Sequence, residues 1–208
     1  MENNLVVKND QQIAKLDNFR TVEDMLGLAK TLIDSKLVPP TLRTPEMVVT
    51  VIQQGRELGF GAVTSINNIH NIQGKPCLSV HAINAKLAQK GIKIKTLKDF
   101  EIQKEGESVD AVTTIRFYVP LEKPINNSFY LEEDVTFKWS QAVDMGLTSK
   151  DNWKKMKSIM LWNRCLSIGA RRVAADSLLG LYEITELADS LNVPYNITEE
   201  GTVTILKD

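Results

Sequence analysis

The stretch DAVTTIRFYVPL, residues 110–121, decides the fold class of this chain. Apolar and polar residues alternate through it, a period typical of a strand with one buried face. The stretches IKIKTLKDFEI (92–102) and NSFYLEEDVTFKW (127–139) alternate in the same way. Three antiparallel strands are therefore predicted, and the cleanest apolar positions are Val109, Ala111, Ile115, Phe117 and Val119.

Two short links are predicted to join these strands, KEGES (104–108) and EKPINN (122–127). The alternation slips between Thr96 and Phe100. An extra residue in one strand produces such a slip, so a β-bulge is predicted there.

Helical signals precede the strands. Thr21 begins a capping pattern, Thr44 followed by Pro45 begins a second helix, and a third runs from a Ser79 cap to a Gly91 stop. Between the second and third, Gly74 marks the bend of a predicted hairpin.

The helical period returns after the strands, in SQAVDMG (140–146), in residues 152–172 and in LYEITELADSLN (181–192), and a short strand is predicted near residues 203–206. The predicted fold is α+β, with helices packed on a small three-stranded antiparallel sheet plus an N-terminal β-hairpin.

Length and composition favour one core. With 208 residues, 43% of them hydrophobic, and a net charge of -1, the chain shows no global bias toward nucleic acid or membrane. We expect a flexible leader at 1–20, a core domain at 21–191 and a tail at 192–208. No membrane-spanning run or signal peptide is recognisable, and Cys77 and Cys165 are expected to be reduced, buried thiols, which favours a cytoplasmic location.

The helix NWKKMKSIMLWNRCLSIGARR, residues 152–172, combines apolar residues with many cations. On a helical wheel, one side carries a core face made of Ile159, Trp162, Leu166, Ala170 and Val173. On another side, Lys157, Arg164 and Arg171 recur every seven residues, in steps of about 10 Å along the helix. A line of cations at that repeat suits a polyanion.

An ordinary interpretation is a solvated basic face, or arginines paired with Glu132, Glu133 and Asp134 elsewhere in the fold. Two features favour a bound polyanion instead. Trp153 lies on the cationic side and offers a stacking surface, and no acidic residue occurs between positions 152 and 175 to pair within the helix.

Linked motifs in this region resemble the RecT family of phage single-strand annealing proteins. The C-terminal signature of the family matches at Trp153, Met160, Leu161, Arg164, Ala170, Arg171, Gly180, Tyr182 and Glu186. Upstream, RTPEMVVTVIQQGRELGFGAVTSINNIHNIQGKPCLSVHAINAKL and FKWSQAVDMGL are similar to further family segments, so the resemblance extends from Leu37 to Leu187.

The resemblance implies a protein, encoded by a phage or prophage and acting in the bacterial cell, that anneals complementary single strands of DNA without ATP. It implies single-stranded DNA and annealed duplex as ligands, further copies of the chain in a ring or helical filament, and a phage exonuclease and the host single-strand binding protein as partners. No catalytic site, no membrane contact and no cofactor are expected, with magnesium dependence left open.

The sequence departs from the family pattern in two places. It ends soon after LYEITEL, before the extension expected to contact the host single-strand binding protein. After the Ala-Arg pair, residues 172–175 replace more apolar or aromatic ones.

Further basic residues complete the predicted DNA site. Lys154 and Arg172 flank the line, Lys75 lies beside the Gly74 bend, Lys138 precedes the helix and Arg43 lies just before a helix N-terminus. Each has an ordinary alternative as a solvated or ion-paired cation, and Trp153 has one as a packing residue.

Two alternatives from other classes stay open. Glu132 and Asp134 near Lys138 suggest a metal-dependent nuclease, because such enzymes need carboxylates around a divalent ion. A phage interaction protein with the same fold but without annealing is the second. A zinc site at His70, Cys77 and His81 is disfavoured because the spacing fits no common pattern.

Overall fold

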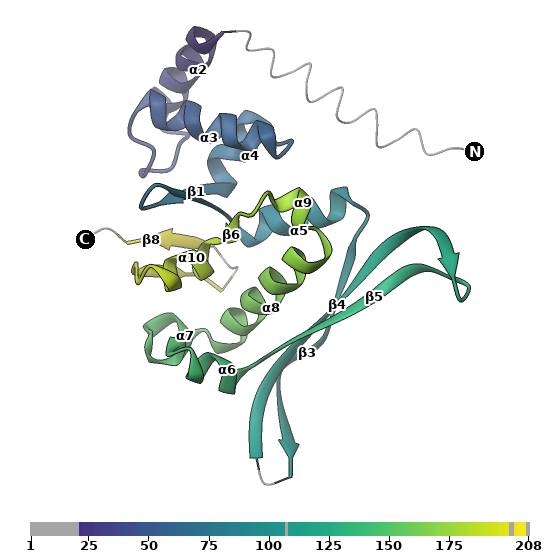
Figure 1. Cartoon of the computed structure of the whole chain (residues 1–208). Coiled ribbons are helices and arrows are strands. Elements are labelled where there is room, and N and C mark those ends of the chain that lie inside the picture. The colour runs from purple at the N-terminus through teal and green to yellow at the C-terminus, as the bar shows by residue number, and fades with distance from the viewer. Residues whose placement is uncertain (1–20, 107, 200–201, 207–208) are drawn as a thin grey trace. The chain divides into compact units, whose positions relative to one another are not determined.

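The structure is a computed structural model that describes residues 21–106, 108–199 and 202–206. The predicted leader at residues 1–20 lies outside the described residues. The fold is α+β, as predicted, with helices and small sheets whose strand pairs are mostly antiparallel (Figure 1). The chain divides into two compact units, residues 1–70 and 71–208. The predicted domain boundaries at residues 20 and 191 stay predictions.

The first unit is helical and contains α2 (Val22–Asp34), α3 (Pro45–Glu57) and α4 (Ala62–Asn68). The predicted caps are confirmed. Thr21 Oγ1 accepts from Asp24 N at 3.1 Å and Thr44 Oγ1 accepts from Met47 N at 3.3 Å, each satisfying an amide that has no partner within its helix. A Cβ at Gly55 would lie 1.8 Å from Ser65 Oγ, so only glycine lets α3 and α4 approach this closely.

Two three-stranded sheets contribute most of the strands of the second unit. In the smaller, of order β1-β2-β6, β1 (Ile69–Ile72) continues from the first unit, and β2 (Lys75–Leu78) pairs in parallel with β6 (Tyr182–Glu183). Gly74 adopts a φ of 79° at the predicted bend. The helix α5 (Val80–Gln89) follows its predicted Ser79 cap.

The larger sheet has the order β3-β4-β5 and is antiparallel, as predicted. Its strands are β3 (Lys93–Glu105), β4 (Ser108–Ile125) and β5 (Ser128–Lys138), so most of the two predicted links are strand. Asn126 and Asn127, with φ of 49° and 61°, make a tight turn that matches strand twist. The predicted bulge is confirmed by register shifts between Thr96 and Glu101.

The helix expected at residues 152–172 is interrupted. After α6 (Trp139–Asp144) and a 3-10 turn (Leu147–Ser149), α7 (Asp151–Lys155) ends at Met156, whose φ of -121° and ψ of 48° are not helical. The long helix α8 (Lys157–Val173) starts only after that residue. A single wheel for Trp153 and Arg164 was therefore wrong, because the break reorients everything before Lys157.

One face of the larger sheet packs on α8, which contacts all three of its strands. A Cβ at Gly169 would lie 2.1 Å from the Phe117 ring, and Cys165 Sγ lies 3.0 Å from Val135 O. Phe117 and Ile115 are fully buried there. Cys165 and Cys77 are buried thiols, as predicted, and burial raises the pKa of both, that of Cys165 to about 11.

The chain closes with α9 (Ala175–Leu178), α10 (Ile184–Ser190), β7 (Tyr195–Ile197) and β8 (Val203–Ile205). The short strand expected near residues 203–206 is confirmed, paired with β7. The helix α10 is shorter than predicted because Glu183 belongs to β6 and caps α10 with its own side chain. Within the described part of the chain, every helix is too short or too polar to cross a bilayer.

Candidate functional site

Arg164, the centre of the predicted cationic line, is buried. Its side chain is 6% exposed, with Nη2 3.0 Å from Asp189 Oδ2 and Nη1 3.3 Å from Glu186 Oε1. Both carboxylates come from α10, which lies close to α8 in the second unit. Because a buried guanidinium needs opposite charge around it, this arginine is committed to the fold in the described state.

Arg171, one helical repeat further on, also pairs with α10. Its guanidinium grips Glu186 with two hydrogen bonds of 2.6 and 2.8 Å and lies 5.2 Å from the Tyr182 ring. Ser167 donates to the same carboxylate. Burial alone would raise the pKa of Glu186, but the hydrogen bonds from Arg171 and Ser167 and the nearby positive charges lower it, so this group stays ionised.

Asp189 completes this cluster from three further sides. Trp153 Nε1 donates to Oδ2 at 2.9 Å, Tyr195 Oη donates to Oδ1 at 3.2 Å, and Lys150 Nζ lies 3.3 Å from Oδ1. Burial beside this carboxylate raises the pKa of Tyr195. We call the group the Arg164 network, defined as Lys150, Trp153, Arg164, Ser167, Arg171, Glu186, Asp189 and Tyr195.

Trp153 is fully buried in the Arg164 network. Its indole also lies 6.1 Å from Trp139 and 5.9 Å from the Arg164 guanidinium. The expectation of an exposed stacking surface at this residue is corrected, because the break at Met156 turns the ring inward, toward α10. The packing alternative describes its position.

The other helix cations have different surroundings. Lys157 is exposed, with Nζ 5.6 Å from the Trp139 ring, Lys154 is exposed on α7, and Arg172 lies 3.6 Å from Glu133. The expectation of one exposed line through Lys157, Arg164 and Arg171 is therefore wrong. The acidic partners of Arg164 and Arg171 are distant in sequence, so a helical wheel of residues 152–172 does not include them. Whether these residues bind DNA stays a prediction.

Lys75 and Arg164 line a common pocket of about 710 Å³. Lys150 lines it as a third cation, and Glu186 and Asp189 bring negative charge into the same space. The pocket thus unites two predicted site residues, but its positive charge is largely compensated.

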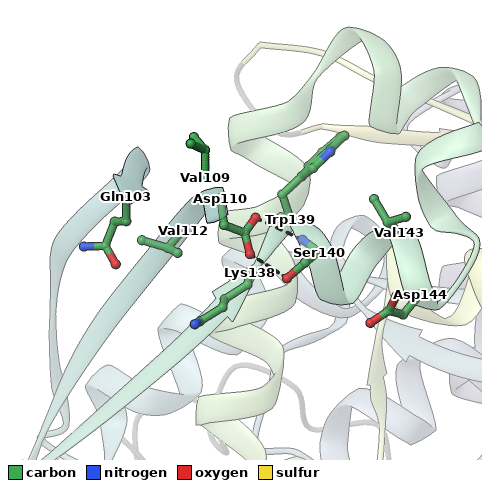
Figure 2. A pocket seen from close by; sticks show the side chains of 9 residues that line it. All are labelled: Gln103, Val109, Asp110, Val112, Lys138, Trp139, Ser140, Val143 and Asp144. Atoms are coloured by element: carbon green, nitrogen blue, oxygen red, sulfur yellow. Dashed lines mark hydrogen bonds between the residues drawn. The ribbon is translucent and has the colours of Figure 1, made fainter. Parts of the chain in front are cut away.

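Lys138 lines a different pocket, of about 520 Å³, at the junction of β4, β5 and α6 (Figure 2). There Asp110 accepts hydrogen bonds from the backbone and hydroxyl of Ser140 and fixes the start of α6. Trp139 and Asp144 complete the polar and aromatic lining (Figure 2). Arg43, the remaining predicted residue, is exposed in the first unit, just before α3.

Three lysines that the sequence interpretation missed lie on the sheet face turned away from α8, which we call the open face. Lys93, Lys95 and Lys98 of β3 stand opposite Tyr118, Arg116 and Thr114 of β4. Among the described residues, no acidic side chain pairs with any of the three. The signal that could have found them is IKIKTLK, where lysine stands at positions 93 and 95 and, across the predicted bulge, at 98.

The acidic residues of β5 have partners on this open face. Arg116 meets Asp134 through two hydrogen bonds of 2.6 and 2.8 Å and lies 2.6 Å from Glu132. The hydrogen bonds from Arg116 lower the pKa of Asp134. These are two of the carboxylates on which the nuclease alternative depends, and each faces a guanidinium. Nowhere in the described ranges do three metal-ligating side chains gather.

Comparison of this chain with protein-family models, with curated proteins and with solved structures found no match. The fold is that of an α+β protein with an antiparallel sheet packed on a helix. Any proposal for its function must therefore be argued from the residues described above.

Proposed function

We propose that this protein binds single-stranded DNA and anneals complementary strands without ATP, acting as an oligomer in phage recombination. The predicted core, residues 21–191, would carry the annealing activity. The proposal is supported by the linked RecT-like motifs between Leu37 and Leu187, several of which lie on α8 and α10. The cytoplasm of the bacterial host is the proposed location.

The observation that carries the DNA-binding part is the lysine row of the open face. Lys93 and Lys95 are two residues apart on one strand, so their side chains rise from the same face about 7 Å apart. Lys98 continues the row after the bulge. An extended row of unpaired cations matches a polyanion that lies along a strand, because each phosphate meets its own positive charge.

Aromatic rings accompany this row. Tyr118 and Tyr130 pack edge to face at 6.3 Å, and Lys93 Nζ lies 5.3 Å from the Tyr130 ring. Both tyrosines are half-buried, and charge beside accessible aromatic surface is the combination that binds single strands without reading their sequence. Neutralised phosphates on a strand whose bases remain accessible would let a complementary strand approach, which is what annealing requires.

In this proposal Arg164 and Arg171 support the fold, and Lys154, Lys157, Arg172 and Lys75 supply secondary phosphate contacts. The acidic side chains of β5 lie across the sheet from β3 and make the open face asymmetric. A strand of DNA would therefore follow the β3 side and avoid the β5 side.

Two triple variants test this assignment. Lys93→Gln with Lys95→Gln and Lys98→Gln alters the open face, and Lys154→Gln with Lys157→Gln and Arg172→Gln is the matched control with the same charge change. Binding of a fluorescent single strand is measured over a series of salt concentrations, together with annealing of complementary oligonucleotides. We expect the open-face variant to lose affinity and its salt slope to fall by about 2, at roughly 0.7 per lost phosphate contact.

The control triple removes only the secondary contacts, so it should lose clearly less affinity and less annealing activity than the open-face variant at the same charge change. An open-face variant that anneals as fast as the parent contradicts the assignment of the lysine row. A parent protein that neither binds single strands at low salt nor anneals them contradicts the proposed function itself.

A further inference from the structure

A pocket of about 360 Å³ lies between α5 and α8, away from the open face and from the Arg164 network. Side chains from the first turns of both helices form its walls, and β3 and the segment after β7 contribute to its rim. The proposed annealing activity makes no use of it. Its lining residues are Val80, His81, Asn84, Asp99, Ser158, Ile159, Trp162, Asn163 and Glu199.

Two amide groups in this pocket have buried hydrogen-bonding atoms without a partner in the described part of the chain. Asn163 is only 2% exposed, yet its Nδ2 has no acceptor among the described residues, and the buried Oδ1 of Asn84 has no donor. An unsatisfied buried polar atom costs roughly 1–3 kcal/mol, so proteins rarely keep one without a use. Here a free donor and a free acceptor line the same space.

The aromatic wall of the pocket has a fixed orientation. Trp162 Nε1 donates to Thr96 Oγ1 at 3.0 Å, which ties the indole to β3 while leaving the side chain half-buried. On the rim, Asp99 accepts from Ser158 Oγ at 2.7 Å, and the exposed Glu199 adds a second carboxylate. Two carboxylates repel phosphate and accept hydrogen bonds from amino groups.

These features together define a ligand. It is flat enough to pack on an indole, presents a hydrogen-bond acceptor to Asn163 Nδ2, and presents a donor to Asn84 Oδ1. Asparagine side chains recognise adenine through an adjacent ring nitrogen and amino group, and acidic side chains accept from the amino group of cytosine. Tryptophan supplies the stacking surface that single bases use in proteins.

We propose that the pocket between α5 and α8 binds a single amino-bearing nucleobase, adenine or cytosine, through Asn84, Asn163 and Trp162. The base would come either from a bound DNA strand or from a free nucleoside. The site is independent of the lysine row, since it reads a base edge and the row meets phosphates. In a bound strand it would add a base preference to an otherwise sequence-neutral protein.

The test uses the whole chain with Asn163→Leu, which removes the orphan donor and preserves side-chain volume. Gln89→Leu, an exposed position on α5, is the matched control. The probes are deoxyadenosine, thymidine, an adenine oligonucleotide and an abasic oligonucleotide of equal length. Quenching of tryptophan fluorescence reports binding, and Trp162→Phe identifies the reporter ring.

We expect deoxyadenosine to quench the parent and the control more strongly than thymidine does, and Asn163→Leu to weaken that binding about tenfold. Thermal melting should show Asn163→Leu to be at least as stable as the parent, because an unsatisfied donor is gone. If that variant does not fold, Asn84→Leu at the half-buried partner position carries the same measurement.

The probes also separate the two sources of the base. If the adenine oligonucleotide binds more tightly than the abasic one, and Asn163→Leu removes that difference, the base comes from a bound strand. If deoxyadenosine quenches the fluorescence but the two oligonucleotides bind equally, the base comes from a free nucleoside. Both results support the site. Equal binding of all probes by parent and Asn163→Leu overturns it and leaves a pocket for water only. Because deoxyadenosine binding requires no annealing, this test can be interpreted even if the protein does not anneal DNA.

Discussion

Arg164 and Arg116 each meet two carboxylates, yet they occupy opposite environments. Arg164 lies between α8 and α10 with 6% of its side chain exposed, while Arg116 lies on the open face with 31% exposed. In the interior each charge depends on the other because water cannot replace a lost partner. On the surface water and salt replace it readily. Regular spacing of cations therefore says little about function until burial is known.

Removal of the buried guanidinium of Arg164 should have the largest effect on stability. Arg164→Met leaves Asp189 and Glu186 without their central cation, and we expect a loss of about 3–5 kcal/mol in the free energy of unfolding. Urea denaturation followed by circular dichroism measures it. Adding Asp189→Asn should recover part of the loss, because one unpaired charge is removed. A loss under about 1 kcal/mol for Arg164→Met would show that the network is not an energetic unit.

Addition of one methyl group to α8, where the helix faces the larger sheet, should have an intermediate effect on stability. Gly169→Ala places a Cβ where the Phe117 ring now lies, at 2.1 Å, so α8 must move or the ring must rotate. Such overpacking typically costs about 1–3 kcal/mol. Thermal denaturation measures it, and Phe117→Leu in the same chain should relieve the clash. Equal stability of Gly169→Ala and the parent would mean that α8 sits less tightly on the sheet than described.

Loss of the surface pair should have the smallest effect. Asp134→Asn removes one carboxylate from Arg116, and we expect only a small decrease in stability that added salt erases. Because the hydrogen bonds from Arg116 lower the pKa of Asp134 in the folded state, its contribution is present above the unfolded pKa and is lost as pH falls through the folded pKa. The stability difference between parent and variant should thus vanish in acid. A difference that grows as pH falls contradicts this pairing.

Local signals in the sequence predicted local structure well. Thr21, Thr44 and Ser79 cap their helices as expected, because a cap needs only residues within one turn. The strands and the bulge follow from side-chain alternation. The strand ends were less predictable, since pairing between β4 and β5 carries regular structure through residues that look like a loop.

Distant contacts account for what the sequence interpretation missed. The partners of Arg164 lie on α10, more than twenty positions away, and no helical wheel contains them. Trp153 is turned inward by a break at Met156 that no glycine or proline announces. The unsatisfied amides of Asn84 and Asn163 line one pocket only because α5 and α8 pack together, so the sequence alone does not reveal that pocket.

Because β3 is an edge strand, its lysines also affect how copies of the protein associate with one another. With β4 on one side only, β3 offers unpaired backbone groups to any other extended chain. Charged lysines along such an edge discourage strand addition between copies, because two of these edges repel each other. A polyanion that covered the lysines would lift that repulsion, so under the proposed DNA binding a bound strand would let the sheet edges of neighbouring copies approach each other.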